Sequence, residues 1–150
     1  MDLVIDTCVL VDASGEGMQE FAHESYDLLS LLRDRDGWRL CFDKKGKIKQ
    51  EYDNRISGQM FAQKWLEATQ GRWCKPDFNR VPKGTRVKLG EVHFDWEDLP
   101  FVETAHSTTT KIIVTREFRS YSTQVLTVLR QELEVKVLRA RDLLGRLPQP

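Results

Sequence analysis

Apolar residues follow two different spacings along the chain, and the two alternate from one end to the other. Short runs rich in branched or alternating apolar residues predict strands at residues 2–7, 38–43, 111–115 and 134–138. Apolar positions that recur every three or four residues predict helices at residues 21–32, 48–68, 97–110, 118–132 and 140–147. Strands that alternate with helices in this way indicate an α/β fold with a mostly parallel central sheet and helices on both faces.

Residues 71–92 interrupt this alternation because they contain several glycines and prolines and show little periodicity. We expect them to form a basic loop or a hairpin insertion, and a loop of this length in a small domain is usually functional or mobile. The remaining elements fit one hydrophobic core, so residues 1–150 are predicted to be a single domain.

Four acidic residues fall where a parallel sheet would bring them to one edge. Asp6 ends the first predicted strand, and Glu117 follows the strand at 111–115. Asp98 begins the helix that leads into that strand, and Glu51 lies in the first turns of the helix at 48–68. Each has a simpler interpretation: Asp6 as a solvated strand end, Asp98 as a helix cap, Glu51 as a solvated helix residue and Glu117 as a first-turn acid.

Converging carboxylates repel one another, and a hard divalent cation removes that cost. Mg²⁺ and Mn²⁺ prefer oxygen ligands, and Mg²⁺ completes its coordination with waters and substrate phosphate oxygens. A cation held in this way can activate a water for attack on a phosphodiester. The sequence contains no nucleophile elbow, phosphate-binding loop or dinucleotide-binding glycine motif, so the acids are the best candidates for chemistry.

Four segments resemble, in order, the motifs of the PIN-domain nucleases. Val-Ile-Asp-Thr-Cys-Val-Leu at 4–10 is similar to the family's opening motif, in which Asn or Ser usually stands where this chain has Cys8. The segments at 48–52, 98–105 and 112–118 resemble those that carry the other acids, although Glu117 stands where Asp is common. Residues 135–138 resemble the last strand, so the similarity spans nearly the whole chain outside 71–92.

This resemblance implies a PIN-like three-layer sandwich and a metal-dependent endoribonuclease, a hydrolase in which Asp6, Glu51, Asp98 and Glu117 hold Mg²⁺ or Mn²⁺. It also implies RNA as substrate, a role as the toxin of a toxin–antitoxin pair or as a defence effector, an antitoxin protein as partner, and a homodimer. A catalytically inactive PIN-like module that binds RNA or protein is the alternative. A third hypothesis, a phosphatase-like or receiver-like domain, has only Thr115 in its favour.

Overall charge does not indicate nucleic-acid binding, because 23 basic residues balance 23 acidic ones. Local charge does, since residues 71–92 concentrate basic side chains that can contact RNA phosphates: Arg72, Lys75, Arg80, Lys83, Arg86 and Lys88. Trp73 and Phe78 lie among them and can stack on unpaired bases. The other interpretation is a solvated loop whose aromatic residues close the core.

Other side chains near these motifs have simpler interpretations. Thr7 and Thr115 follow strand ends, where a hydroxyl could hold a carboxylate or a water, but ordinary β-branched strand preference is the simpler interpretation. A lone His106 is more often structural. Glu103 is a spare candidate for the metal site.

The three cysteines, Cys8, Cys41 and Cys74, are widely spaced and odd in number, so they do not form a disulfide framework. A zinc site from Cys41, Cys74 and His93 lacks a Cys-x-x-Cys pair, and buried or free thiols are the better interpretation. The sequence shows neither a signal-peptide pattern nor an apolar run long enough for a membrane span, so we expect a cytoplasmic protein without membrane contact.

Overall fold

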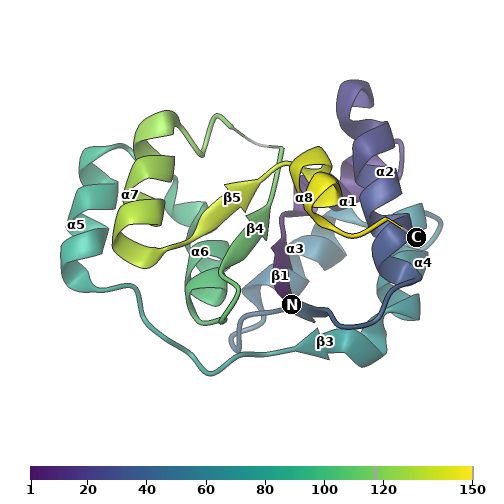
Figure 1. Cartoon of the computed structure of the whole chain (residues 1–150), viewed down its shortest axis with the longest axis horizontal. Helices are drawn as coiled ribbons and strands as arrows, with labels where there is room; N and C mark the ends of the chain where they lie inside the picture. The colour runs from purple at the N-terminus through teal and green to yellow at the C-terminus, as the bar shows by residue number, and fades with distance from the viewer. Residues whose placement is uncertain (117, 150) are drawn as a thin grey trace.

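The computed structural model describes residues 1–116 and 118–149, so Glu117 and Pro150 lie outside the described residues. The strands of the described chain form one parallel sheet in the order β3-β2-β1-β4-β5 (Figure 1). They are β1 (Asp2–Ile5), β2 (Arg39–Cys41), β3 (Trp73–Cys74), β4 (Ile112–Val114) and β5 (Lys136–Leu138). Helices cover both faces, which confirms the predicted three-layer α/β fold.

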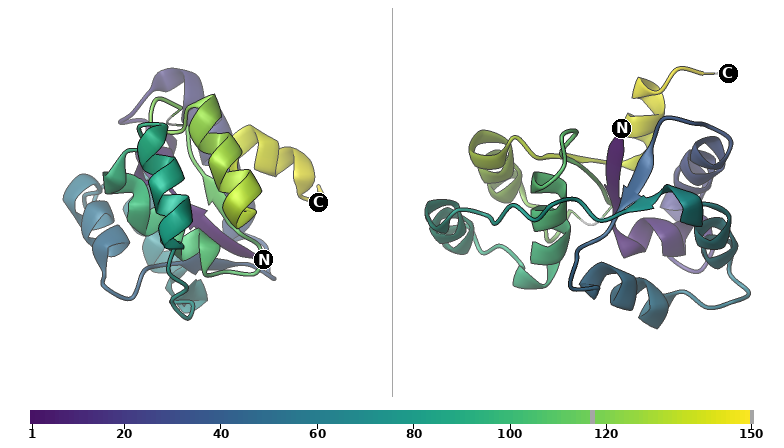
Figure 2. Two further views of the ribbon diagram at one scale, coloured as in Figure 1. Left: turned by 90° about the vertical axis from the view of Figure 1, so that its left-hand side faces the viewer. Right: turned by 90° about the horizontal axis from the view of Figure 1, so that it is seen from below.

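The helices fall into two groups, one on each face of the sheet. The α-helices are α1 (Thr7–Ala13), α2 (Gln19–Arg33), α3 (Lys47–Arg55), α4 (Phe61–Ala68), α5 (Lys83–Glu91), α6 (Leu99–His106), α7 (Thr123–Leu133) and α8 (Ala140–Arg146). Two 3₁₀ turns, η1 (Gln70–Arg72) and η2 (Trp96–Asp98), precede β3 and α6. Helices α5 and α7 lie side by side on one face, while α2 packs on α1 and α8 on the other (Figures 1 and 2). No helix in the described residues is both long and apolar enough to cross a membrane.

β1 is the central strand, and its side chains Leu3, Val4 and Ile5 are fully buried. It pairs with β2 on one side and with β4 on the other. From β1, the strands β2 and β3 follow in one direction and β4 and β5 in the other, so the strand order reverses between β1 and β4. In open parallel sheets this switch point forms a crevice that binds ligands.

Several local features differ from the sequence prediction, among them the predicted helix at 118–132, which begins only at Thr123. Residues 7–13 form α1, whose apolar run is buried on every side and so lacks the amphipathic spacing that identifies a surface helix. The predicted helix at 48–68 is two helices, because the chain becomes extended at Ile56 and passes through Ser57 and Gly58 before α4.

Residues 71–92 are neither one long loop nor a hairpin. They provide the edge strand β3, an irregular stretch at 75–82 and the helix α5. Only Thr85 and Leu89 of α5 are buried, so the helix has too narrow an apolar face to produce a clear periodic signal in the sequence.

Candidate metal centre and adjoining groove

Asp6 lies at the centre of the sheet's carboxyl edge, directly after β1. Its backbone N–H donates to the Val114 carbonyl at 2.8 Å, which extends the pairing of β1 with β4 by one residue. The Asp6 side chain is 8% exposed, and its burial raises its pKa. A carboxylate buried at a strand end without a cation is unfavourable, so the solvated-strand-end interpretation does not fit its environment.

Thr115 directly follows β4, and its hydroxyl donates a hydrogen bond to Asp6 Oδ2 at 2.7 Å. Both side chains are buried, so this contact fixes the orientation of the Asp6 carboxyl. Cys8 Sγ lies 3.6 Å from the same Thr115 oxygen. Burial and the charge of Asp6 raise the pKa of the Cys8 thiol to about 12, so Cys8 packs here as a neutral group.

Glu51 reaches the same edge from α3. The next residue, Tyr52, is fully buried and donates its hydroxyl hydrogen bond to the Ile5 carbonyl at the end of β1. This contact anchors α3 beneath the strand end and places the half-buried Glu51 beside Asp6. Burial raises the pKa of Glu51, and the negative charge of Asp6 raises it further.

Asp98 lies at the junction of η2 and α6. It occupies the N-cap position of α6, but its side chain makes no capping hydrogen bond, so the helix-cap interpretation does not account for it. Burial raises the pKa of Asp98 to about 7, and the charges of Asp6 and Asp95 contribute. Within the described residues its Oδ2 atom is buried without a hydrogen-bond partner.

The structure thus brings Asp6, Glu51 and Asp98 close enough for the charge of Asp6 to raise the pKa of both other carboxyls. Tyr121 completes the surroundings: it is fully buried, and burial together with the charges of Asp6 and Asp98 raises its pKa well above the usual value. No ion pair in the described part of the chain neutralises any of the three carboxylates. Glu117, the fourth predicted acid, lies outside the described residues.

These carboxylates fit a hydrated divalent cation. All the donors are oxygens, which suits Mg²⁺ or Mn²⁺, and the unpartnered Oδ2 of Asp98 is available as a ligand. Their oxygens do not all lie within 4.8 Å of one another in the described structure. With that spacing, a cation at this edge would contact part of the set directly and the rest through its bound waters.

A buried ion pair secures the loop that follows β4. Asp12 of α1 is fully buried and accepts a hydrogen bond from Arg116 Nε at 2.9 Å and from the Met18 backbone N–H at 2.8 Å. Gly17 leaves room for this carboxylate, because a Cβ there would lie 2.0 Å from Asp12 Oδ1. The pair joins α1, which begins after Asp6, to the residue after Thr115, so both strand ends of the centre are held together.

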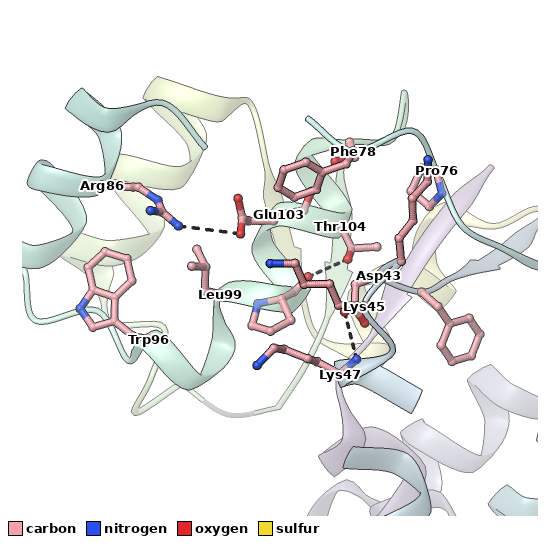
Figure 3. Close-up of a pocket in the computed structure, with 14 residues that line it drawn as sticks. Asp43, Lys45, Lys47, Pro76, Phe78, Arg86, Trp96, Leu99, Glu103 and Thr104 are labelled. Atoms are coloured by element: carbon pink, nitrogen blue, oxygen red, sulfur yellow. Dashed lines mark hydrogen bonds and ion pairs between the residues drawn. The ribbon is translucent and has the colours of Figure 1, made fainter. Parts of the chain in front are cut away.

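A groove of about 460 Å³ lies at the same edge of the sheet, past the carboxyl ends of β2 and β3 (Figure 3). Leu99 and Pro100, which directly follow Asp98, form part of its lining, as does Lys47, one helical turn before Glu51. Figure 3 shows Lys45 and Lys47 across the groove from Arg86, with Glu103 near the Arg86 guanidinium.

The groove combines cations with exposed aromatic rings. Lys44, Lys45, Lys47 and Arg86 line it together with Phe78 and Trp96, which are 59% and 45% exposed. Among these cations, Lys44 pairs with Asp77 at 3.3 Å, and Arg86 lies 3.9 Å from Glu103. Cations that can contact phosphates beside rings that can stack on bases are typical of single-stranded nucleic-acid sites.

The six basic residues predicted to bind RNA lie in different surroundings. Arg86 lines the groove, and Lys75 lines a separate cavity next to β3. Arg80 and Lys83 are exposed, whereas Lys88 pairs with Glu132 on α7. The Arg72 guanidinium donates to the carbonyls of Leu32 and Arg35 and stacks over Trp38, so its contacts are structural.

Glu103, the spare metal candidate, is directed into the groove and away from the metal centre. Its Oε2 atom accepts a hydrogen bond from the Val81 backbone N–H at 3.2 Å, and its Oε1 atom faces Arg86. Glu103 therefore holds the 75–82 segment and α5 against α6.

Comparison with known proteins adds no relative: no family model matches the sequence, and no curated protein or solved structure is significantly similar to it. The fold and the arrangement of its acidic side chains therefore carry the functional interpretation.

Proposed function

We propose that the protein is a metal-dependent endoribonuclease of the PIN type. The observation that carries this proposal is the meeting of Asp6, Glu51 and Asp98, from three separate segments, at the switch point of a parallel sheet. Carboxyls whose pKa is raised by burial and by a neighbouring carboxylate are typical of sites that bind a cation or transfer a proton. The adjoining basic and aromatic groove supports RNA as the substrate.

In this proposal each side chain has a separate role. Asp6, Glu51 and Asp98 hold the cation, and Thr115 keeps the Asp6 carboxyl in one orientation. A divalent cation bound there supplies an activated water and neutralises charge on the phosphodiester. Lys45, Lys47 and Arg86 hold the RNA backbone in the groove, and the exposed rings stack on its bases. Glu117 remains a predicted fourth ligand.

The test of this function is cleavage of a mixed RNA pool by the purified full chain. We expect cleavage with Mg²⁺ or Mn²⁺, loss of cleavage with excess chelator, and recovery when the metal is restored. Binding of RNA without cleavage under every metal condition would favour the alternative, an inactive PIN-like binding module. The antitoxin partner and the homodimer also remain predictions, and sedimentation of the purified chain tests the second.

The groove makes a separate prediction about salt. The triple substitution Lys45→Ala, Lys47→Ala and Arg86→Ala is expected to weaken RNA binding. The slope of the logarithm of affinity against the logarithm of salt concentration should become shallower by about 0.7 for each phosphate contact that is lost. A matched triple variant, Arg130→Ala, Arg141→Ala and Arg146→Ala, removes the same charge from exposed positions outside the groove. Equal salt slopes in the two triple variants would remove the groove from the RNA path.

A further inference from the structure

Two thiols face each other across β2 and the edge strand β3. Cys41 and Cys74 are the last residues of β2 and β3 and are register partners. Their Sγ atoms lie 3.0 Å apart, and both cysteines are free. Neighbouring strands are about 4.8 Å apart, which falls within the Cα separations of about 4.4–6.8 Å that a disulfide spans. The backbone therefore already permits a bond.

The two thiols differ in access. Cys41 is fully buried, whereas Cys74 is half-buried and lines a cavity of about 640 Å³ that Lys49, Trp73 and Lys75 also line. A small reagent can thus reach the sulfur of Cys74 and not that of Cys41. Burial also raises the pKa of the Cys41 thiol, so a reaction begins at Cys74.

A metal ion is the competing occupant, because the ligand atoms of Asp2, Cys41 and Cys74 lie within 4.8 Å of one another. The Arg39 guanidinium opposes it. Arg39 donates to both oxygens of Asp2, at 2.8 and 3.0 Å, and its charge also acts on both cysteines. A divalent cation would have to displace this guanidinium or sit beside it, whereas oxidation of the thiols leaves the Asp2–Arg39 pair intact.

We propose that Cys41 and Cys74 are a modification site that forms a reversible disulfide on reaction with a peroxide. The sulfur of Cys74 attacks one peroxide oxygen, the O–O bond breaks, and the leaving hydroxide takes up the thiol proton as water. The resulting sulfenic acid is attacked by the sulfur of Cys41: an S–S bond forms, the S–O bond breaks, and a second water leaves with the Cys41 proton. Two thiols and one hydrogen peroxide thus give one disulfide and two waters.

The bond would secure the weakest edge of the sheet. β3 has only two residues and pairs with β2 alone. It leads directly into the 75–82 segment, whose Pro76 and Phe78 line the groove. A covalent link at Cys74 restrains the start of that segment and constrains the unfolded chain.

The test treats the fully reduced chain with stoichiometric hydrogen peroxide and is independent of nuclease activity. We expect the intact mass to fall by two hydrogens and only Cys8 to remain labelled by a thiol reagent after denaturation. Reductant should reverse both changes. The midpoint of thermal unfolding should rise by about 5 °C on oxidation.

Two single variants separate the steps. Cys41→Ser should accumulate a sulfenic acid at Cys74 that a dimedone-type reagent traps, and Cys74→Ser should form neither that adduct nor a disulfide. Oxidation of Cys74 to sulfinic acid in the wild type without a disulfide would overturn the proposal. Stoichiometric Zn²⁺ binding by the reduced protein, lost in both variants and protecting the thiols from peroxide, would replace the proposal with a metal site.

Discussion

Replacing Asp6 by Asn is expected to lower metal-dependent RNA cleavage by at least about 10³-fold. Asn has nearly the same shape, and its side-chain oxygen can still accept the hydrogen bond from Thr115. The substitution therefore removes the negative charge at the centre while preserving local packing. Initial cleavage rates at saturating Mn²⁺, compared between variant and wild type, measure the effect.

The matched control is Asp53→Asn, which removes an exposed acid from the same helix as Glu51. Its ion pair with Lys49 is a surface pair of small energetic value, so its cleavage rate should stay near that of the wild type. Cleavage by Asp6→Asn at the wild-type rate, in protein of normal thermal stability, would exclude Asp6 from the mechanism and with it the proposed centre.

Replacing Asp98 by Asn is expected to stabilise the metal-free protein at pH 8 by about 1–3 kcal/mol. The ordinary pKa of this carboxyl is 3.8, and burial raises it to about 7 in the folded protein. The folded state therefore binds more protons than the unfolded chain between about pH 4 and 7. The free energy of unfolding of the wild type therefore falls as the pH rises from about 4 to 7, because the folded protein must then bury the ionised Asp98 carboxylate. Asn carries no charge, so the variant does not have this loss.

Urea unfolding in the presence of chelator, at pH 5 and at pH 8, measures this difference. We expect the free energy of unfolding to fall less for the variant than for the wild type between these two pH values. When Mn²⁺ replaces the chelator, it should stabilise the wild type more than the variant. Glu91→Gln, at an exposed position on α5, serves as the control. A helix-cap role for Asp98 would instead leave stability nearly unchanged at both pH values, since Asn caps helices as well as Asp.

Much of the fold could be predicted from the sequence because buried parallel strands leave a strong signal. The run Leu3-Val4-Ile5 and the run Ile112-Ile113-Val114 are uninterrupted apolar segments, and both form interior strands of the sheet. The edge strand β3 could not be predicted in the same way. It has two residues and is only half-buried, so its pairing with β2 is fixed by tertiary contacts and not by local sequence preference.

The positions of Asp6 and Asp98 followed from topology. Asp6 directly follows a parallel strand, and Asp98 begins the helix that runs back to the start of β4, so both fall at the carboxyl edge of the sheet. The side chains around them did not follow from topology. The position of Thr115 after a strand end allows its hydroxyl to hold a carboxylate, but ordinary strand preference explains the residue equally well. Only the fold shows that this hydroxyl binds Asp6, 109 positions away in the sequence. Tyr121 follows β4 in a loop, and its burial beside the carboxylates depends on how that loop folds back.

The predicted RNA-binding residues show the limit of reading charge along a segment. The basic residues of 71–92 share a stretch of sequence but spread over η1, the 75–82 segment and α5. Of that set, only Arg86 lines the groove. The other cations that line it are Lys44, Lys45 and Lys47, which follow β2. The best sequence signal for the added lysines was their position after a predicted strand end, where parallel sheets place their sites.

The most direct measurement of the central claim is an anomalous difference map from crystals of the full chain soaked in Mn²⁺. The proposal predicts a peak at the carboxyl edge of the sheet, bounded by Asp6, Glu51 and Asp98. A map that shows Mn²⁺ only elsewhere on the molecule, with this edge empty at a saturating Mn²⁺ concentration and a pH above 7, would contradict it.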